Sequence, residues 1–325
     1  MADYSTIKGF NVQVLSADPP APQDGQVWYN TTTGTMKAYG QIGTGAWTAG
    51  GGLNNAMQEA GGVGTPGAAI VAGGSPPPTG KVAETYDGSS WTVSTSMNDS
   101  KIYPGNIGTQ TTAMFAGSTN PPFTASTEVW NGASWTELNA MNTGRGMMYS
   151  SIAGTPSAAI VSGGSNPPGT GLNLAESFNG TTWTAMTAMP ATARGGSGAG
   201  TQTSYIAWGG YPDSTVSQVW NGASWSTVSA MTVNRRMFQE SGASDSSAMA
   251  AAGTYPPGVR LTICEQWNGT AWTEVADMAA TKEGGEGGGT TSSAWVAGGY
   301  GPAGTGGPAM EIWAIPTTTK TFTAS

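Results

Sequence analysis

The stretch that decides the fold is ETYDGSSWT, from Glu84 to Thr92. Closely related segments follow it along the chain: EVWNGASWT, ESFNGTTWT, QVWNGASWS and EQWNGTAWT, with a truncated copy, EIWAIP, near the end. These segments begin, 42 to 48 residues apart, at Glu84, Glu128, Glu176, Gln218, Glu265 and Glu311. A steady period of this length indicates a repeat architecture, because each repeat needs its neighbours to bury its apolar face.

Each repeat predicts four strands. An apolar strand that ends in Gly-Gly, such as AAIVAGG, precedes the E-x-aromatic strand, and a W-T strand follows it. Upstream of these three, a Met and a basic residue lead into the first strand, as in MNDSK. Asn-Gly or Asp-Gly between the third and fourth strands is typical of a two-residue hairpin turn. With such a turn, Trp130 faces Ala133 across the hairpin, and both tryptophans of the repeat point to one face of the sheet.

Four-stranded units of about 45 residues, stacked around an axis, make a β-propeller. The Gly-Gly pair, the aromatic of the third strand and the Trp of the fourth resemble the kelch repeat in all six copies. We therefore expect an all-β, six-bladed kelch-like β-propeller of four-stranded blades over residues 47–316. The W-T strand occurs only five times after residue 55, so GAWTAGG at the N-terminal side is predicted to supply the sixth and close the ring. The tryptophans expected to pack between blades are Trp47, Trp91, Trp135, Trp183, Trp225 and Trp272.

The two ends of the chain lie outside the repeats. Residues 1–46 are expected to form an N-terminal arm and hairpin, with strands near Val27–Asn30 and Thr35–Tyr39. The hairpin stretch GQVWYNTTTGTMKAYG resembles one that is common in virion structural and tail-fibre proteins of tailed phages, especially marine ones. In those proteins it is often coupled to kelch-like repeats of the kind seen here in GTQTTAMFAG. Residues 317–325 are expected to be a C-terminal tail, which either adds an edge strand to a neighbour or stays loose.

Composition argues against several classes of function. The chain of 325 residues has a formal net charge of −8, whereas nucleic-acid binding usually needs a basic surface, so no nucleic acid is expected as a partner. No apolar run approaches the roughly 18 residues of a membrane span, so no membrane insertion is expected. The chain has no histidine, which excludes Ser-His-Asp triads and His-ligated metals. No Tyr/Glu pair stands out for glycosidic chemistry. We therefore predict a protein that is not an enzyme, with no catalytic residues, cofactor or metal.

Binding is expected on the Pro-rich loops between the second and third strands of the repeats, because these loops vary in length on a rigid scaffold. Their candidate contact residues are Phe123, Tyr211, Tyr255 and Tyr300. Basic residues in matching places before the first strands belong to the same face: Lys101, Arg145, Arg194, Arg235 and Lys282. The cations form either a positive ring at one mouth of the channel or internal pairs with the repeated Glu. The prolines either frame a binding surface or merely stiffen exposed loops.

The resemblance to phage proteins implies a structural protein located in the virion, after assembly in the host cytoplasm. The expected role is that of a tail fibre or tail-associated adhesin that docks onto other virion proteins through residues 1–46. A host-surface glycan or receptor is its expected external partner, and a homo-oligomeric assembly is expected. A capsid-surface decoration protein is the alternative, and a carbohydrate-active enzyme ranks third.

Overall fold

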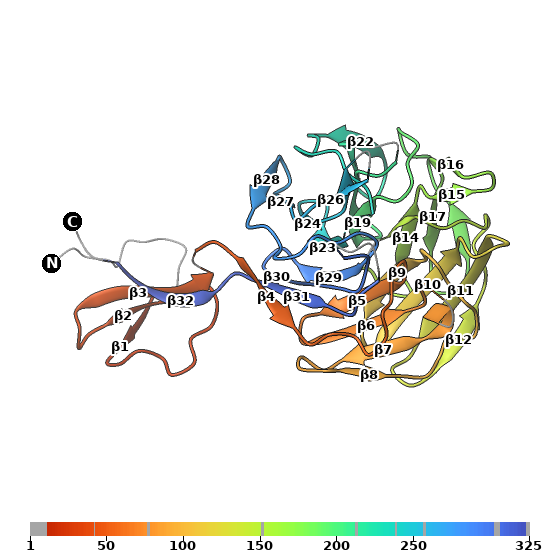
Figure 1. Ribbon diagram of the computed structural model, residues 1–325. Helices are drawn as coiled ribbons and strands as arrows, with labels where there is room; N and C mark the ends of the chain where they lie inside the picture. The colour runs from red at the N-terminus through yellow and green to blue at the C-terminus, as the bar shows by residue number, and fades with distance from the viewer. Residues whose placement is uncertain are drawn as a thin grey trace. The chain divides into compact units, whose positions relative to one another are not determined.

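The computed structural model describes residues 12–41, 43–76, 79–150, 153–211, 214–237, 239–255, 258–301 and 306–322. Its regular structure is almost entirely β-strand (Figure 1), with one short 3-10 helix at Thr79–Lys81 among the residues described. The chain divides into two compact units. One consists of Met1–Gly45 together with Ala314–Ser325, and the other is Ala46–Trp313.

The smaller unit is a four-stranded sheet with the order β1-β2-β3-β32. Its strands are β1 (Gln13–Leu15), β2 (Val27–Asn30), β3 (Thr35–Gln41) and β32 (Thr317–Phe322). β1 and β2 pair in parallel, whereas β2 with β3 and β3 with β32 pair antiparallel. The β2–β3 hairpin lies where the sequence predicts it. The C-terminal segment differs from the expected tail, because β32 completes the sheet of its own chain.

Asp18 ties the hairpin together through its carboxylate. Its Oδ1 accepts hydrogen bonds from Trp28 Nε1 at 3.0 Å and from Asn30 Nδ2 at 2.7 Å, and its Oδ2 accepts one from Lys37 Nζ at 2.5 Å. These donors stabilise the ionised form, so the bond from Lys37 and those from Asn30 and Trp28 lower the pKa of Asp18 to about 2. Trp28 itself is fully buried.

The larger unit contains six four-stranded sheets within the described part of the chain. Five of them are built from strands that follow one another along the sequence, as in a meander. Their strands are β5–β8 (Gly61–Thr65, Ala68–Ala72, Ala83–Tyr86, Trp91–Val93), β9–β12 (Gly105–Thr109, Thr112–Ser118, Thr124–Trp130, Trp135–Leu138), β13, β14, β17 and β18 (Tyr149–Ser150, Ala159–Ser162, Ala175–Phe178, Trp183–Ala185), β19–β22 (Ser197–Thr201, Ser204–Trp208, Ser217–Trp220, Trp225–Val228), and β23, β24, β27 and β28 (Gln239–Ser244, Ser247–Ala251, Cys264–Trp267, Trp272–Val275). Two-stranded ribbons extend two of the loops between second and third strands: β15 (Ser165–Asn166) with β16 (Thr170–Gly171), and β25 (Thr254–Tyr255) with β26 (Val259–Arg260).

The sixth sheet combines strands from the two ends of the larger unit. Its order is β29-β30-β31-β4, with strands β29 (Glu286–Thr290), β30 (Ser293–Ala297), β31 (Met310–Ala314) and β4 (Ala46–Gly50). The Trp47 ring lies 5.6 Å from that of Trp313, and Trp47 Nε1 donates to the carbonyl of Ala276 at 3.1 Å. The outer strand therefore comes from the N-terminal side, as the count of W-T segments predicts.

The hairpin between third and fourth strands has a four-residue turn instead of the two-residue turn expected. Trp130 pairs directly with Trp135. Between them, Asn131 Oδ1 accepts hydrogen bonds from the backbone N–H groups of Ala133 and Ser134, both at 2.9 Å. A side chain that bonds its own turn favours this longer loop over the tighter one. The same bonds are made by Asp87, Asn179, Asn221 and Asn268. Direct pairing still leaves both rings on one face, with centroids 5.3 Å apart.

The apolar core lies between successive sheets. One cluster joins Ile70 of the β5–β8 sheet to Phe115 and Trp135 of the β9–β12 sheet. Another joins Trp91 of β8 to Trp295 of β30, so the first sheet also packs on the last. Of the six tryptophans expected between blades, four are buried, Trp91, Trp135, Trp183 and Trp272, and two are half-buried, Trp47 and Trp225.

Glycine is frequent in the first strands because these strands approach one another closely. A Cβ on Gly62 of β5 would lie 2.8 Å from the Cβ of Glu286 on β29, and one on Gly288 of β29 would lie 2.7 Å from the backbone oxygen of Gly64 on β5. Both separations are too short for any side chain. The first strands make contact in succession, β5, β9, β13, β19, β23 and β29, and β29 returns to β5 (Figure 1).

Candidate binding face

Six backbone hydrogen bonds form a closed cycle beside the first strands. Each member of the cycle lies two residues before a first strand and has a left-handed backbone, with φ between 50° and 62°. Each N–H donates to the carbonyl of the member in the preceding repeat, over 2.6 to 3.0 Å. The members are Glu59, Tyr103, Met147, Gly195, Met237 and Gly284. Four of them are not glycine, and this conformation is uncommon for such residues, so the cycle holds them in it.

The loops after Gly-Gly surround this cycle, because the residue before a cycle member bridges to the residue after a Gly-Gly. The bridges include Gln58 with Ser75, Arg194 with Tyr211, and Glu283 with Tyr300. Glycine is required beside them: at Gly73, where φ is 85°, a Cβ would lie 2.6 Å from a carbonyl oxygen. We call the surface that is formed by the cycle and by the loops between second and third strands the loop face.

Four of the five candidate cations are buried inside the sheets and do not line the loop face. They are Lys101, Arg145, Arg235 and Lys282. Three of them pair with the Glu of the third strand: Lys101 with Glu128, Arg145 with Glu176, and Arg235 with Glu265. Lys282 donates to the carbonyls of Gly298 and Ala309, at 3.2 and 2.9 Å. The hypothesis of a positive ring is therefore wrong for these four.

These four cations are buried because the repeated carboxylate, which is itself buried, needs a positive charge beside it. Each buried cation lies four residues after the repeated Met. At this position its side chain lies inside the sheet and not in the solvent. Burial lowers the pKa of Lys101, Arg235 and Lys282, whereas the charges of Glu128, Glu265 and Glu311 respectively oppose this lowering.

The repeated carboxylate also anchors the connection that follows each fourth strand. Backbone N–H groups next to the repeated Met or its counterpart donate to it, at 2.7 to 2.8 Å. These donors and acceptors are Asn54 and Glu84, Asn98 and Glu128, Asn142 and Glu176, Thr232 and Glu265, and Ala279 and Glu311. The recurring Glu thus has a structural role.

Two repeats lack the buried cation, and each replaces it differently. In the first repeat, Glu84 accepts four hydrogen bonds from the backbone and side-chain amides of Asn54 and Asn55, at 2.7 to 3.0 Å. In the fourth, Ala193 occupies the place of the cation and Gln218 replaces the Glu, so no charge is buried. The fourth repeat thus loses charge and counter-charge together, whereas the first repeat keeps the carboxylate and replaces the cation with amide donors.

Arg194 lies one place beyond the buried cations, five residues after its Met, which is the place that Arg236 holds in the fifth repeat. It lines a cavity of about 320 Å³ on the loop face, together with Phe123, Tyr211 and Arg236. The guanidinium carbon of Arg194 lies 4.5 Å from the centroid of the Tyr211 ring, and that of Arg236 lies 5.1 Å from it. Three of the candidate residues, Phe123, Tyr211 and Arg194, thus meet in one concave site, which we call the Arg194 pocket.

The remaining two aromatic candidates lie elsewhere. Tyr255 belongs to the β25–β26 ribbon, is 44% exposed, and is not among the described residues that line the Arg194 pocket. Tyr300 is half-buried and turns toward Glu59 at the cycle.

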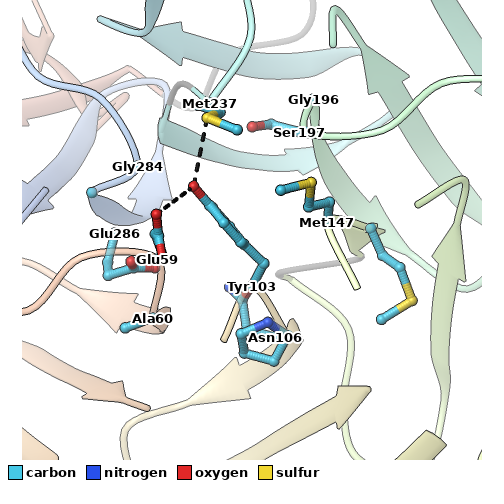
Figure 2. Close-up of a pocket in the computed structure, with 14 residues that line it drawn as sticks. Glu59, Ala60, Tyr103, Asn106, Met147, Gly196, Ser197, Met237, Gly284 and Glu286 are labelled. Carbon is cyan, nitrogen blue, oxygen red and sulfur yellow. Dashed lines mark hydrogen bonds between the residues drawn. The ribbon is translucent and has the colours of Figure 1, made fainter. Parts of the chain in front are cut away.

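A smaller cavity, with a volume of about 60 Å³, lies at the cycle itself, and Glu59 is one of the residues that line it (Figure 2). Glu59 Oε1 accepts hydrogen bonds from the hydroxyls of Tyr103 and Tyr300, both at 3.0 Å. Its Oε2 accepts one from Ser75 Oγ at 2.8 Å. The Tyr103 hydroxyl also lies 3.5 Å from Met237 Sδ (Figure 2). A Tyr/Glu pair that the sequence did not reveal is therefore present at the centre of the loop face.

The electrostatics of this pair hold the proton on tyrosine. Burial and the negative charge of Glu59 raise the pKa of Tyr103, and the same two causes raise that of Tyr300. A nucleophilic tyrosine needs the opposite shift, because its phenolate must form readily. The arrangement is thus suited to hydrogen bonding and poorly suited to covalent catalysis.

Three residues of this region escaped the sequence analysis: Glu59, Tyr103 and Arg236. The cycle position holds Glu, Tyr, Met or Gly in different repeats, so no single residue type marks it along the sequence. The sequence shows Arg236 only as the second residue of Arg235-Arg236. That it is the more exposed of the two follows from the burial of Arg235, which the sequence does not reveal.

No group of three or more His, Cys, Asp or Glu side chains in the described ranges is placed to hold a metal ion. Cys264 is buried, and burial raises the pKa of its thiol to about 11, which disfavours the reactive thiolate. A helix long and apolar enough to cross a membrane is not found in the described part of the chain.

The fold has a counterpart among solved structures. The structure of YjhT superimposes with a TM-score of 0.69 and covers 83% of this chain and 99% of its own, with 11% of residues identical. At this level of identity the likeness concerns the fold alone, and it supports an all-β, propeller-like architecture. No family model matches the sequence, and no curated protein matches it.

Proposed function

We propose that the chain is a non-enzymatic structural protein of a tailed-phage virion, whose larger unit binds the host surface. The observation that carries this proposal is the Arg194 pocket. It combines aromatic rings and guanidinium groups in a concave site on loops that connect the strands of the sheets. Binding sites typically take this form.

We also infer that the larger unit is a closed, six-bladed kelch-like propeller. The cycle of six backbone hydrogen bonds supports closure, since its last donor returns to its first acceptor. The packing of Trp91 on Trp295 and the presence of β4 in the last sheet support it as well. Such a ring gives the loops of six repeats one common face.

The smaller unit is the proposed attachment module. Its hairpin carries the resemblance to tail-fibre and other virion proteins. Its sheet combines strands that precede the larger unit in the sequence with one that follows it. In this proposal residues 1–46 dock onto other virion proteins, and the loop face of the larger unit binds a host-surface glycan or receptor. A homo-oligomeric assembly in the virion belongs to the same proposal.

Cell binding by the purified, fluorescently labelled chain tests the adhesin role. Tyr211→Ala should reduce binding to bacterial host cells at least tenfold, because aromatic anchors dominate binding energies. Tyr255→Ala is the matched control: both tyrosines are about equally exposed, at 42% and 44%, but only Tyr211 lines the pocket among the residues described. Equal losses in the two variants would reject the Arg194 pocket as the binding site, and no binding by the unmodified chain would reject the adhesin role.

The position in the virion separates the adhesin from the capsid-decoration alternative. Immunogold labelling of purified particles, with an antibody against residues 47–316, should mark the tail. Labels on the head would favour a decoration protein, and unlabelled particles would reject the virion assignment.

A glycan-release assay on host envelope tests the third role, that of a carbohydrate-active enzyme. The Tyr103–Glu59 pair is the feature that favours such an enzyme, whereas the raised pKa of Tyr103 opposes it. We expect no sugar release. Release that is lost in Tyr103→Phe would support the enzyme and reject the proposed role.

A further inference from the structure

We infer that the Arg194 pocket binds a carboxylated saccharide of the bacterial surface, with a hexuronate unit as the recognised group. This inference rests on the proposed function in host binding and adds the chemical class of the ligand. Arg194 is assigned to the carboxylate, and Tyr211 and Phe123 to the sugar ring.

The distribution of cations singles out this site. The chain has only 11 Lys and Arg residues against 19 Asp and Glu. Four of these cations are buried within the sheets. Three arginines, Arg194, Arg236 and Arg260, lie instead on the loop face, beside Tyr211 and Tyr300. Two of them, Arg194 and Arg236, line the same concave site of an acidic protein, and positive charge gathered in this way attracts anions.

Arg194 differs from the other two arginines in its partners. Arg260 is paired with Glu283 at 3.0 Å, and Arg236 has further interactions of its own. Arg194 has no carboxylate partner among the described residues, and its guanidinium lies over the Tyr211 ring. A guanidinium stacked in this way keeps its edge N–H groups for an external acceptor. Two parallel N–H groups match the two oxygens of a carboxylate.

The rest of the pocket fits the body of a sugar. Tyr211 is 42% exposed, and Phe123 is half-buried in the opposite loop. Aromatic faces of this kind pack against the C–H faces of pyranose rings. The volume of about 320 Å³ is at the small end of the range for ligand pockets, which suits a short saccharide segment.

The charges of the neighbouring groups favour a singly charged ligand over a phosphate. Glu59 and Glu286 line the adjacent cavity, which shares Met147, Gly195 and Met237 with the Arg194 pocket. A phosphate monoester carries up to two negative charges at neutral pH and would be repelled more strongly by these carboxylates.

Titration calorimetry with trigalacturonate tests the assignment on the full chain. Its methyl ester is the matched control ligand, because it has the same sugars without the carboxylates. We expect the acid to bind at least tenfold more tightly than the ester, and added salt to weaken its binding. Arg194→Gln should weaken binding of the acid at least tenfold, as loss of a charged hydrogen bond does. Lys320→Gln removes the same charge from an exposed position in the other compact unit and should change the affinity less than twofold.

Several outcomes would overturn the inference: no binding of the acid, equal binding of acid and ester, or equal effects of Arg194→Gln and Lys320→Gln. Tighter binding of trigalactose phosphate than of trigalacturonate would assign the pocket to a phosphorylated ligand. The cell-binding assay distinguishes this failure from failure of the proposed function. Cell binding that excess trigalacturonate does not inhibit would retain the adhesin and reject the uronate, whereas uronate binding without cell binding would reject the adhesin alone.

Discussion

Replacing Arg235 by methionine is expected to destabilise the larger unit, because it leaves the buried carboxylate of Glu265 without a counter-charge. Arg235 and Glu265 are both fully buried, with Nη2 and Oε2 2.9 Å apart. In Arg235→Met the carboxylate keeps the Thr232 N–H and hydroxyl as donors, at 2.7 and 2.6 Å, but loses its counter-charge. Removing one partner of a buried ion pair costs about 3–5 kcal/mol, because the other charge stays buried. We expect the free energy of unfolding to fall by that amount.

The fourth repeat shows how the loss can be repaired. There, Ala193 takes the place of the cation and Gln218 that of the Glu. The double variant Arg235→Met, Glu265→Gln reproduces this neutral combination and should recover all but about 1 kcal/mol of the loss. Melting temperatures should follow, with roughly 2–4 °C for each kcal/mol in a unit of this size.

Urea unfolding of the full chain, followed by tryptophan fluorescence, measures both variants against the unmodified protein. A loss below about 1 kcal/mol in the single variant would contradict a buried, charge-dependent pair. A double variant no more stable than the single one would show that the cost comes from lost packing instead of an uncompensated charge.

Three further predictions concern other parts of the chain. The pKa of Asp18 is about 2 in the folded chain against an ordinary value of 3.8, so its stabilisation of the hairpin is present above pH 4 and is lost as the pH falls toward 2; hydrogen exchange of residues 27–41 should rise over that interval. Glu59→Gln removes the negative charge beside Tyr103 and Tyr300 and should lower the pKa of both, as seen by ultraviolet difference titration. Trp135→Ala should destabilise the chain by about 3–5 kcal/mol, and Trp225→Ala by less, because Trp225 is only half-buried; equal losses on urea unfolding would contradict this.

Most of the fold could be predicted from the repeated sequence segments. A Trp on each side of a turn and a Gly-Gly before the third strand recur in the sequence, so four-stranded units and the origin of the sixth outer strand were predictable. The turn length was not, because Asn131 has two ways to serve a hairpin. Its side chain either accompanies a tight two-residue loop or, as found, bonds the N–H groups of Ala133 and Ser134.

The candidate site was predictable only in part. Phe123 and Tyr211 were found because they lie on variable Pro-rich loops. Arg194 was found for the wrong reason, since Ala193 holds the place of the buried cation and Arg194 is the next residue, in the same place as Arg236. The cycle around Glu59 and Tyr103 left no signal, because backbone groups form it and almost any residue type can occupy its positions.

Closure of the ring by the N-terminal strand is tested most directly by the melting temperatures of two truncated chains. One lacks residues 1–45 and keeps β4, and the other lacks residues 1–50 and loses β4 with Trp47. Both leave β32 without its partner β3, so they differ only in the strand that completes the last sheet. We predict that the shorter deletion leaves the transition of the larger unit within a few degrees of the full chain, and that the longer one lowers it by more than about 10 °C. Identical melting temperatures would contradict closure by β4.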